Sequence, residues 1–429
     1  MIDIRVIREN PDLIKDSLKK RFKEDKIKLI NEIKEKDILV RNLKKETDDL
    51  RKKRNDLAQE INELKKKGKD IKKVLAEAKD IPGIIKEKEA TLETLQNEIN
   101  YYLLRLPNII HESVPKGKDA SENKEIRKSG KIEKKNFEIK NHAELIEELK
   151  LADFEAGRKL AGQGFNYLFD DLAQLDLALQ RYGIDFLVKK GFNVVIPPML
   201  IRKETMEGVV NMSDFEEVIY KVENEDLYLI GTAENSLVPI FKDEKIPYDN
   251  LPIKLCAVTP CFRKEIGGHG VDTKGLFRMH QFNKVEQVVF SKPEESYKLL
   301  EEMQKISEEF FKSLEIPFRV IEICSGDLGD KQAKQYDIEA WFPRQDSYKE
   351  VTSASNCTDY QSRRLNMKYL KKDATRDFLH ILNNTMVATS RAMVAILENH
   401  QNKDYSVNIP KVLQPYMYNK KKIEAKKDK

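Results

Sequence analysis

A seven-residue repeat of apolar side chains constrains the fold of this chain more than any other feature of its sequence. The first repeat begins near residue 27 and places apolar residues at Ile33, Val40, Leu43, Leu50, Leu57, Ile61 and Leu64. A second repeat continues at Ile71, Ala78, Ile85, Leu92, Ile99 and Leu106. Heptads are typical of coiled coils, and a turn at 67–70 separates the two runs, so we expect an antiparallel coiled-coil hairpin over about 27–106. Two helices of roughly 40 residues give an arm on the order of 60 Å long.

The charge of this hairpin allows two interpretations. Residues 21–70 hold 17 lysines and arginines against 12 acidic residues, and lysines gather near the turn at Lys65, Lys66, Lys67 and Lys69. Such an arm could lie along a phosphate backbone. A solvated, lysine-rich coiled coil that only dimerises would have the same sequence pattern. Pro82 and Gly83 interrupt the second run and predict a kink in that helix.

The composition indicates at least two domains and a soluble protein. The chain has 429 residues, more than one hydrophobic core usually organises. Charged residues make up 35% of it and the mean hydropathy is −0.61. No apolar run approaches the roughly 18 residues of a membrane span, and the first residues lack a signal-peptide core. We therefore expect a cytoplasmic protein without a membrane partner. The net charge of +5 is too balanced to indicate a polyanionic partner by itself.

The cysteines and histidines indicate neither disulfides nor zinc. The cysteines lie without paired spacing, at Cys256, Cys261, Cys324 and Cys357. The six histidines form no HExxH or similar cluster. We expect reduced, buried thiols and no zinc site.

Residues 113–140 lack apolar periodicity and are rich in Gly, Ser, Asn and Lys, which predicts a linker and a domain boundary. A second domain is expected at 141–418, followed by a disordered, lysine-rich tail at 419–429. Its helical patterns lie at about 142–156, 169–190 and 293–314. Pro197 and Pro198 end a short strand at 192–196 and suit a sheet edge or subunit contact. The later strand-like segments predict an antiparallel sheet with helices packed against it.

A glycine-rich β-hairpin is predicted between Thr259 and Glu286. Strand alternation places Arg263 and Glu265 on one face, and Phe282, Lys284 and Glu286 on one face of the partner strand. If those faces coincide, they form a pocket with a guanidinium for a phosphate, a ring for a planar base and carboxylates for amino groups. This combination suits a nucleotide together with an amine-bearing substrate. An exposed hairpin with salt-bridged charges is the alternative.

Three further segments each have a functional and a structural interpretation. Thr232 and Glu234 follow a strand, where ligand contacts are common, but they would also suit a helix N-terminus. Glu350 and Ser353 could hold a divalent ion on phosphates, or form a surface turn. Arg391 lies in a helix that is apolar almost all round, so it needs an anion such as a ligand phosphate, unless Glu398 marks a solvated face.

Together these segments resemble the seryl-tRNA synthetases, a family of class II aminoacyl-tRNA synthetases. The resemblance spans essentially the whole chain. It is carried by the helical arm and by Thr232 to Glu234, Phe262 to Glu265 with Arg278 to Glu286, Glu350 to Ser353, and Asn383 to Arg391. It implies an α+β chain with a tRNA-binding domain at 1–112, and a class II catalytic domain whose antiparallel sheet of six or seven strands is flanked by helices. It also implies a homodimer, formed partly through the segment ending at Pro197-Pro198.

The resemblance further implies roles for individual residues. Arg263 and Arg391 would be catalytic, Arg263 on the ATP α-phosphate and the serine carboxylate, and Arg391 on the γ-phosphate and the adenine face. Glu265 would read the adenine amino group and Phe282 would stack on the ring. The other implied ATP contacts are Lys264, Met279, Glu350, Val351, Thr352 and Ser353, of which Glu350 and Ser353 would bind Mg²⁺. The implied serine contacts are Thr232, Ala233, Glu234, Arg263, Glu286, Asn383 and Thr385.

The resemblance also implies the reaction and its partners. Serine and ATP would form seryl-adenylate, and the seryl group would pass to the 3′ end of tRNA(Ser), with tRNA(Sec) as a further candidate. The loop 267–274 would touch the acceptor end while the arm lies against the long variable arm of the tRNA. This chain has Asn384-Thr385-Met386 where many relatives have Gly-Ser-Gly. We interpret this as a tolerated variant of the motif, in which Thr385 takes the place of the serine. A zinc-dependent form of the enzyme lacks this kind of arm, so no zinc is expected.

Two other functions fit parts of the sequence. A relative that delivers an activated amino acid to a carrier protein would need no tRNA-binding arm, so the intact heptads count against it. A coiled-coil interaction protein with a vestigial nucleotide site would show no serine-dependent exchange of pyrophosphate into ATP. The residues alone do not select serine over another small amino acid.

Overall fold

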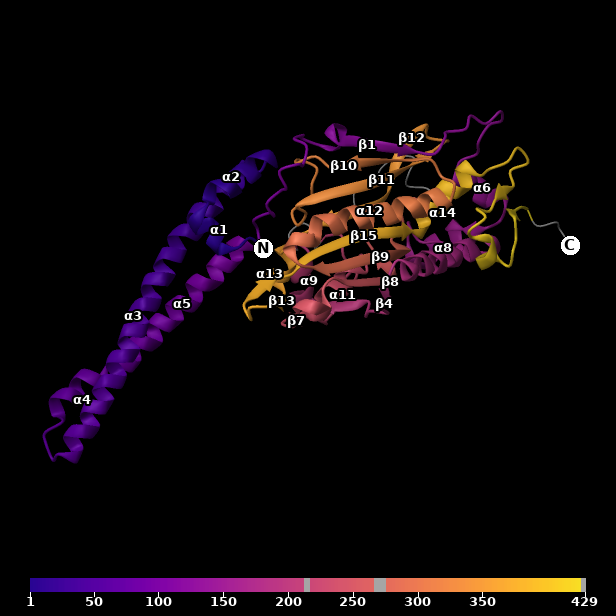
Figure 1. The fold of residues 1–429 in the computed structure, drawn as a ribbon. Helices are drawn as coiled ribbons and strands as arrows, with labels where there is room; N and C mark the ends of the chain where they lie inside the picture. Colours follow the sequence, from indigo (N-terminus) through magenta and orange to yellow (C-terminus); the bar gives the residue numbers. More distant parts are fainter. Residues whose placement is uncertain (212–216, 266–274, 426–429) are drawn as a thin grey trace. The chain divides into compact units, whose positions relative to one another are not determined.

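The computed structural model describes residues 1–211, 217–265 and 275–425. Its backbone contacts divide it into two units, Met1–Ile109 and Ile110–Lys429 (Figure 1). No helix within these described ranges is long and apolar enough to cross a membrane.

The first unit contains the antiparallel helical hairpin that the heptads predict. Its helices are α1 (Ile4–Glu9), α2 (Pro11–Lys20), η1 (Glu24–Lys26), α3 (Ile27–Lys66), α4 (Lys72–Lys79) and α5 (Ile81–Leu103). Figure 1 shows α3 and α5 packed side by side. The predicted seam positions are buried or half-buried, with Ile33, Val40, Leu57, Ile85 and Ile99 the most enclosed among them along the two helices. Burial of these side chains stabilises the hairpin, at about 25 cal/mol per Å² of apolar surface.

Ion pairs connect the two long helices of the hairpin. Lys36 pairs with Glu98 at 2.6 Å, and Glu46 pairs with Lys88 at 2.6 Å. Exposed pairs of this kind each contribute at most about 1 kcal/mol, so the apolar seam supplies most of the stability.

The predicted kink at Pro82 takes the form of a helix boundary. α4 ends at Lys79 and α5 begins at Ile81, so Pro82 lies in the first turn of α5. Backbone N–H groups in the first turn of a helix have no acceptor within that helix, so a proline there costs no hydrogen bond. The chain therefore accommodates proline by starting a new helix.

The second unit is built on one mixed sheet. Within the described residues eight strands pair in the order β1 (Lys124–Ser129), β10 (Phe318–Glu322), β11 (Lys334–Phe342), β12 (Ser347–Asn356), β15 (His380–Ala388), β9 (Gln281–Ser291), β8 (Ile253–Phe262) and β4 (Asn193–Val194). Neighbours are antiparallel except β4 and β8, which are parallel. The α+β fold class is confirmed, with more strands than the six or seven expected.

The two faces of this sheet have different coverings. The long helices α8 (Asp170–Lys189), α12 (Ser296–Ser313) and α14 (Thr389–Asn399) pack against one face (Figure 1), where Gln287 of β9 donates to Ser307 of α12 at 3.1 Å. The next residue back, Glu286, therefore points to the opposite face. That face meets the short helices α9 (Lys203–Val209), α11 (Glu234–Leu237) and α13 (Tyr360–Arg364).

Smaller elements complete the second unit. The helices are η2 (Ala120–Glu122), α6 (His142–Glu148), α7 (Phe154–Ala161), η3 (Val238–Phe241), η4 (Tyr248–Asn250), η6 (Pro293–Glu295) and η7 (Gln414–Met417). Small sheets pair β2 (Ala152–Asp153) with β3 (Tyr167–Leu168), β5 (Leu200–Arg202) with β6 (Leu227–Leu229), β7 (Lys245–Pro247) with β13 (Lys368–Leu370) and β14 (Arg376–Phe378), and β16 (Val407–Asn408) with β17 (Lys422–Ile423).

Three sequence-based predictions are wrong in detail. The expected linker at 113–140 contains β1, an edge strand whose exposed faces leave no apolar alternation to detect. The helix expected at 142–156 is two helices separated by β2. The tail expected to be disordered contributes β17, where Ile423 is fully buried. In each case a strand forms by pairing with a strand elsewhere in the chain, and the local sequence pattern does not reveal that pairing.

Candidate active site

The strands β8 and β9 place a guanidinium and an aromatic ring on one face. Cys261 of β8 lies opposite Phe282 of β9, so Arg263, two residues further along, continues the face that carries Phe282. The Arg263 guanidinium carbon lies 5.5 Å from the Phe282 ring centroid, and its Nε donates to the Gly231 carbonyl at 3.0 Å. The faces predicted from strand alternation therefore coincide.

A cleft extends over this face of the sheet in two connected parts. The first part is lined by Arg263, Glu265, Phe277, Met279, Phe282, Lys284, Glu350, Val351, Thr385, Ala388, Ser390 and Arg391. The second part has a volume of about 430 Å³, and its polar lining includes Thr232, Glu234, Glu286, Lys331, Ser353 and Asn383. Arg263 lines both parts and lies where they join.

A β-bulge brings Glu350 and Ser353 to the cleft together. Ser353 lies opposite Asp337 on β11, whereas Glu350 lies opposite Glu339, and the register shifts between them. The bulge inserts one residue, so side chains three apart share a face. Thr352, between them, is buried on the other side of β12 and does not line the cleft.

Arg391 extends from the first turn of α14 to the same strand. Its Nη1 donates to the Glu350 carbonyl at 2.9 Å and lies 3.3 Å from the Glu350 carboxylate. The guanidinium carbon is 5.1 Å from the Phe277 ring centroid. The side chain is 28% exposed. Glu398, the alternative marker of a solvated face, is itself 1% exposed and accepts from the Arg344 backbone N–H at 3.2 Å.

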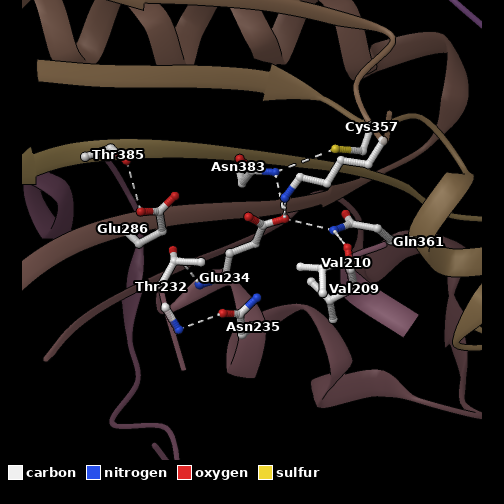
Figure 2. Close-up of polar contacts among 12 residues, drawn as sticks. Val209, Val210, Thr232, Glu234, Asn235, Glu286, Cys357, Gln361, Asn383 and Thr385 are labelled. Atoms are coloured by element: carbon white, nitrogen blue, oxygen red, sulfur yellow. Dashed lines mark hydrogen bonds and ion pairs between the residues drawn. The ribbon is translucent and has the colours of Figure 1, made fainter. Parts of the chain in front are cut away.

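The second part of the cleft contains two buried carboxylates (Figure 2). Glu234 begins α11 and is 5% exposed, and Glu286 on β9 is 2% exposed. The Asn383 amide donates to Glu234 at 3.2 Å, and the Thr385 hydroxyl donates to Glu286 at 3.2 Å. The Thr232 hydroxyl accepts from the Glu234 backbone N–H at 3.3 Å. β15 therefore supplies one donor for each carboxylate.

Two lysines compensate the charge of these carboxylates. Lys284 lies 2.7 Å from Glu286, and Lys331 pairs with Glu234. Burial raises the pKa of Glu286, and the attraction of Lys284 offsets this only in part. Burial also acts to raise the pKa of Glu234, but Lys331, together with Gln361 and Lys284, outweighs it, so the pKa of Glu234 is lowered overall. The two carboxylates therefore differ in how strongly the pocket holds them ionised.

Most of the sequence-predicted site residues line this cleft, and three do not. Ala233 is fully buried, Thr352 points to the other face, and the Lys264 ammonium lies 5.6 Å from the Tyr220 ring centroid. The loop expected to touch the tRNA acceptor end, 267–274, lies outside the described residues.

Sequence analysis assigned no role to several residues that the structure brings to the cleft. Lys284 lies on the strand face of Phe282, as alternation predicts, but it was given no role. Lys331 lines the cleft from a turn-rich segment, and Gln361 of α13 donates to Glu234; no periodicity marks either of them.

The structure contains no cluster of three or more His, Cys, Asp or Glu side chains placed to hold a metal, as far as its described residues go. All four cysteines are buried, and none of them forms a disulfide within the described residues. The expectation that the chain needs no zinc remains a prediction.

Comparison with known proteins identifies this architecture. Residues 218–400 match the tRNA synthetase class II core domain (G, H, P, S and T), so the sheet and its cleft are a class II aminoacyl-tRNA synthetase core. Residues 1–110 match the seryl-tRNA synthetase N-terminal domain. The chain is 48% identical to the serine--tRNA ligase of Methanospirillum hungatei over 98% of its own length and 99% of the relative's. It belongs to the seryl-tRNA synthetase family, whose members are serine--tRNA ligases.

Solved structures agree with this assignment. The seryl-tRNA synthetase of Pyrococcus horikoshii, complexed with ATP, is 47% identical with a TM-score of 0.94, and the match covers 100% of both chains. The cytoplasmic serine-tRNA ligase of Naegleria fowleri, in complex with AMP, is 36% identical with a TM-score of 0.89, covering 100% of this chain and 99% of that one. A prolyl-tRNA synthetase of Giardia lamblia, at 16% identity and a TM-score of 0.55, shares the fold over 63% of this chain and 54% of its own.

Proposed function

We propose that the cleft binds ATP in its first part and L-serine in its second, with Arg263 contacting both. The observation that carries this proposal is the convergence of two arginines and an aromatic ring at one end with two buried carboxylates at the other. Guanidinium groups bind phosphates, and buried carboxylates attract an ammonium and accept from a hydroxyl. A crystal structure with a non-hydrolysable seryl-adenylate analogue tests the proposal, which predicts the adenine beside Phe282 and the seryl group beside Glu234 and Glu286.

The reaction in this cleft requires alignment more than acid–base chemistry. The serine carboxylate is already a nucleophile at neutral pH and attacks the α-phosphorus of ATP, releasing pyrophosphate and forming seryl-adenylate. Arg263 lies between the two parts, where it can align both groups and stabilise the charge that develops on the α-phosphate. The terminal ribose hydroxyl of the tRNA then attacks the activated carbonyl, and AMP leaves.

Within the first part, Glu265 is proposed to accept from the adenine amino group and Arg391 to contact the γ-phosphate. Met279 and Val351 line the same part. A magnesium ion carried on the phosphates fits the donors present, because the Glu350 carboxylate is half exposed and the Ser353 hydroxyl lines the adjoining part of the cleft. Mg²⁺ prefers such oxygen ligands and, when bound, neutralises phosphate charge.

Within the second part, Glu286 is proposed to accept from the serine hydroxyl. Glu286→Ala is expected to raise the KM for serine by about 10- to 100-fold, because a hydrogen bond to a charged group in a buried site contributes about 1.5–3 kcal/mol. The KM for ATP should stay unchanged. Steady-state ATP–pyrophosphate exchange measures both constants, and an unaltered serine KM would refute this role.

We propose that the first unit binds tRNA(Ser), with tRNA(Sec) as a further candidate substrate. The lysines near the tip of the hairpin are all exposed, at Lys65, Lys66, Lys67 and Lys69. A rigid rod with exposed lysines suits recognition of an RNA backbone and its shape more than its bases. Such a substrate is consistent with action in the cytoplasm.

We also propose that the chain forms a homodimer through the end of α8 and the segment after it. Large apolar side chains are exposed there at Val188, Val194, Ile196, Met199 and Leu200, and Ile196 is 90% exposed. An exposed apolar patch of this kind is typical of a subunit interface. The patch surrounds the Pro197-Pro198 segment that the sequence associates with a subunit contact.

The variant Ile196→Lys tests the dimer. An ammonium placed in an apolar interface has no partner, so the variant should elute as a monomer. Light scattering after size exclusion should give the wild type twice the 50.0 kDa of the chain. Ile126→Lys, at an exposed side chain on β1, the edge strand at the opposite end of the sheet from β4, is the matched control and should remain dimeric. A monomeric wild type would contradict the proposal.

A further inference from the structure

The Glu234 carboxylate receives its hydrogen bonds on one oxygen. Gln361 Nε2 donates to Oε1 at 2.8 Å, Asn383 Nδ2 donates to Oε1 at 3.2 Å, and Lys331 Nζ pairs with the same atom. No donor from the described residues lies on Oε2, although Glu234 lines the cleft. The arrangement holds the carboxylate in one orientation and leaves its second oxygen for a ligand.

Lys331 reaches this site from outside the strands that build the cleft. It lies in the segment 323–333 between β10 and β11, yet its side chain is only 16% exposed and lines the cleft beside α11. A lysine ammonium is costly to bury unless an anion pairs with it, and the same holds for the Glu234 carboxylate. Each charge therefore stabilises the other in this position.

Other ionisable groups near Glu234 do not replace Lys331. Lys284 also attracts Glu234, but it forms its ion pair with Glu286, which repels Glu234. The nearby Cys357 thiol has its pKa raised to about 12 by burial, so it is neutral at physiological pH. Without Lys331, two buried carboxylates would share a single lysine.

We propose that Lys331 is a positioning residue for serine recognition, which keeps Glu234 ionised and directs its Oε2 toward the α-ammonium of serine. The inference rests on the proposed place of Glu234 among the serine contacts. A neutral carboxyl at this point would lose most of its attraction for an ammonium. Lys331 thereby sets the affinity for the amino acid without contacting ATP.

The charge on Lys331 has a consequence for pH dependence. The pKa of Glu234 is lowered although the carboxyl is buried, because Lys331, and to a lesser extent Gln361 and Lys284, favour its ionised form. Removing the ammonium leaves burial as the main influence, and burial raises the pKa of a carboxyl. Glu234 would then become protonated at a higher pH than in the wild type, and serine binding would weaken as the pH falls.

The test compares Lys331→Met with two matched variants in ATP–pyrophosphate exchange between pH 6 and 8. Lys331→Met is expected to raise the serine KM by about 10- to 100-fold at pH 7, and further as the pH falls, with the ATP KM unchanged. Lys331→Arg should restore a pH-independent serine KM. Lys334→Met removes a neighbouring lysine whose Nζ lies 3.2 Å from Glu322 on β10, and it should leave the serine KM as in the wild type.

Three outcomes would overturn the inference. A serine KM raised equally at every pH would mean that Lys331 only fills space. A lowered KM would mean that its ammonium competes with that of serine. An unchanged KM would mean that Glu234 needs no help from it.

The variant Glu234→Gln separates this inference from the proposed function. It should raise the serine KM at every pH, and adding Lys331→Met to it should have little further effect, since both act through one carboxylate. If Glu234→Gln alone leaves serine use intact, the proposed serine contacts are wrong. If it impairs serine use while Lys331→Met does not, only the present inference fails.

Discussion

Arg263→Ala is expected to lower the kcat/KM for serine-dependent ATP–pyrophosphate exchange by at least about 10²- to 10³-fold. Loss of one preorganised donor to a developing negative charge typically costs this much. Arg263 lines both parts of the cleft, so its loss also removes the group that aligns serine with ATP. The Gly231 carbonyl that accepts from its Nε would keep access to water in the open cleft, so the fold should tolerate the change.

A matched variant distinguishes lost chemistry from lost folding. Arg319→Ala removes a guanidinium from β10 that pairs with Glu339 and Glu125 away from the cleft lining. It should retain full exchange activity. Both variants should elute as the wild type does and unfold at a similar temperature. Near-normal exchange by a folded Arg263→Ala protein would refute the role assigned to this residue.

Excision of the distal hairpin is expected to separate the two half-reactions. Residues 47–87 can be replaced by a short glycine-rich turn, because Glu46 and Lys88 face each other across the hairpin at 2.6 Å. The cut leaves the buried cluster at the base of the unit, including Ile30, Ile33, Ile99 and Leu103. ATP–pyrophosphate exchange should be unchanged, while the kcat/KM for tRNA charging should fall by about 10²-fold or more, as phosphate contacts are lost.

Salt provides the accompanying control for the arm. Binding through lysine–phosphate contacts releases counterions, so charging by the full-length chain should weaken steeply as salt increases. The shortened chain should show a shallower dependence. Equal loss of exchange and charging on excision would mean that the arm is needed for the catalytic unit, which contradicts the proposed separation of roles.

The parts of the fold that follow a strict period could be predicted from sequence. The heptads predict the helical hairpin, because the seven-residue repeat of its buried seam does not depend on the rest of the chain. The face shared by Arg263 and Phe282 follows from strand alternation and the hairpin register. Both patterns are local in sequence, and the structure confirms the helical hairpin and the shared strand face that they predict.

Irregular features were accessible only through resemblance. Plain alternation would place Glu350 and Ser353 on opposite faces of β12, and a single-residue bulge brings them together. The same bulge turns Thr352 away from the cleft, although the resemblance implied that it contacts ATP. A bulge leaves no composition signal that a single sequence would reveal.

Long-range contacts were the least predictable part of the site. Lys331 meets Glu234 across 97 residues of sequence, from a segment of turns without periodicity. β1 was missed for a related reason, since an edge strand with exposed faces has no apolar alternation. In both cases the partner, and not the local sequence, determines the position.

The most direct measurement of the central claim is ATP–pyrophosphate exchange by the purified chain with each of the twenty amino acids in turn. A cleft that aligns serine with ATP through Arg263, Glu234 and Glu286 predicts rapid exchange with L-serine and little with the others. Exchange that does not depend on serine, or that is faster with another amino acid, would contradict the account.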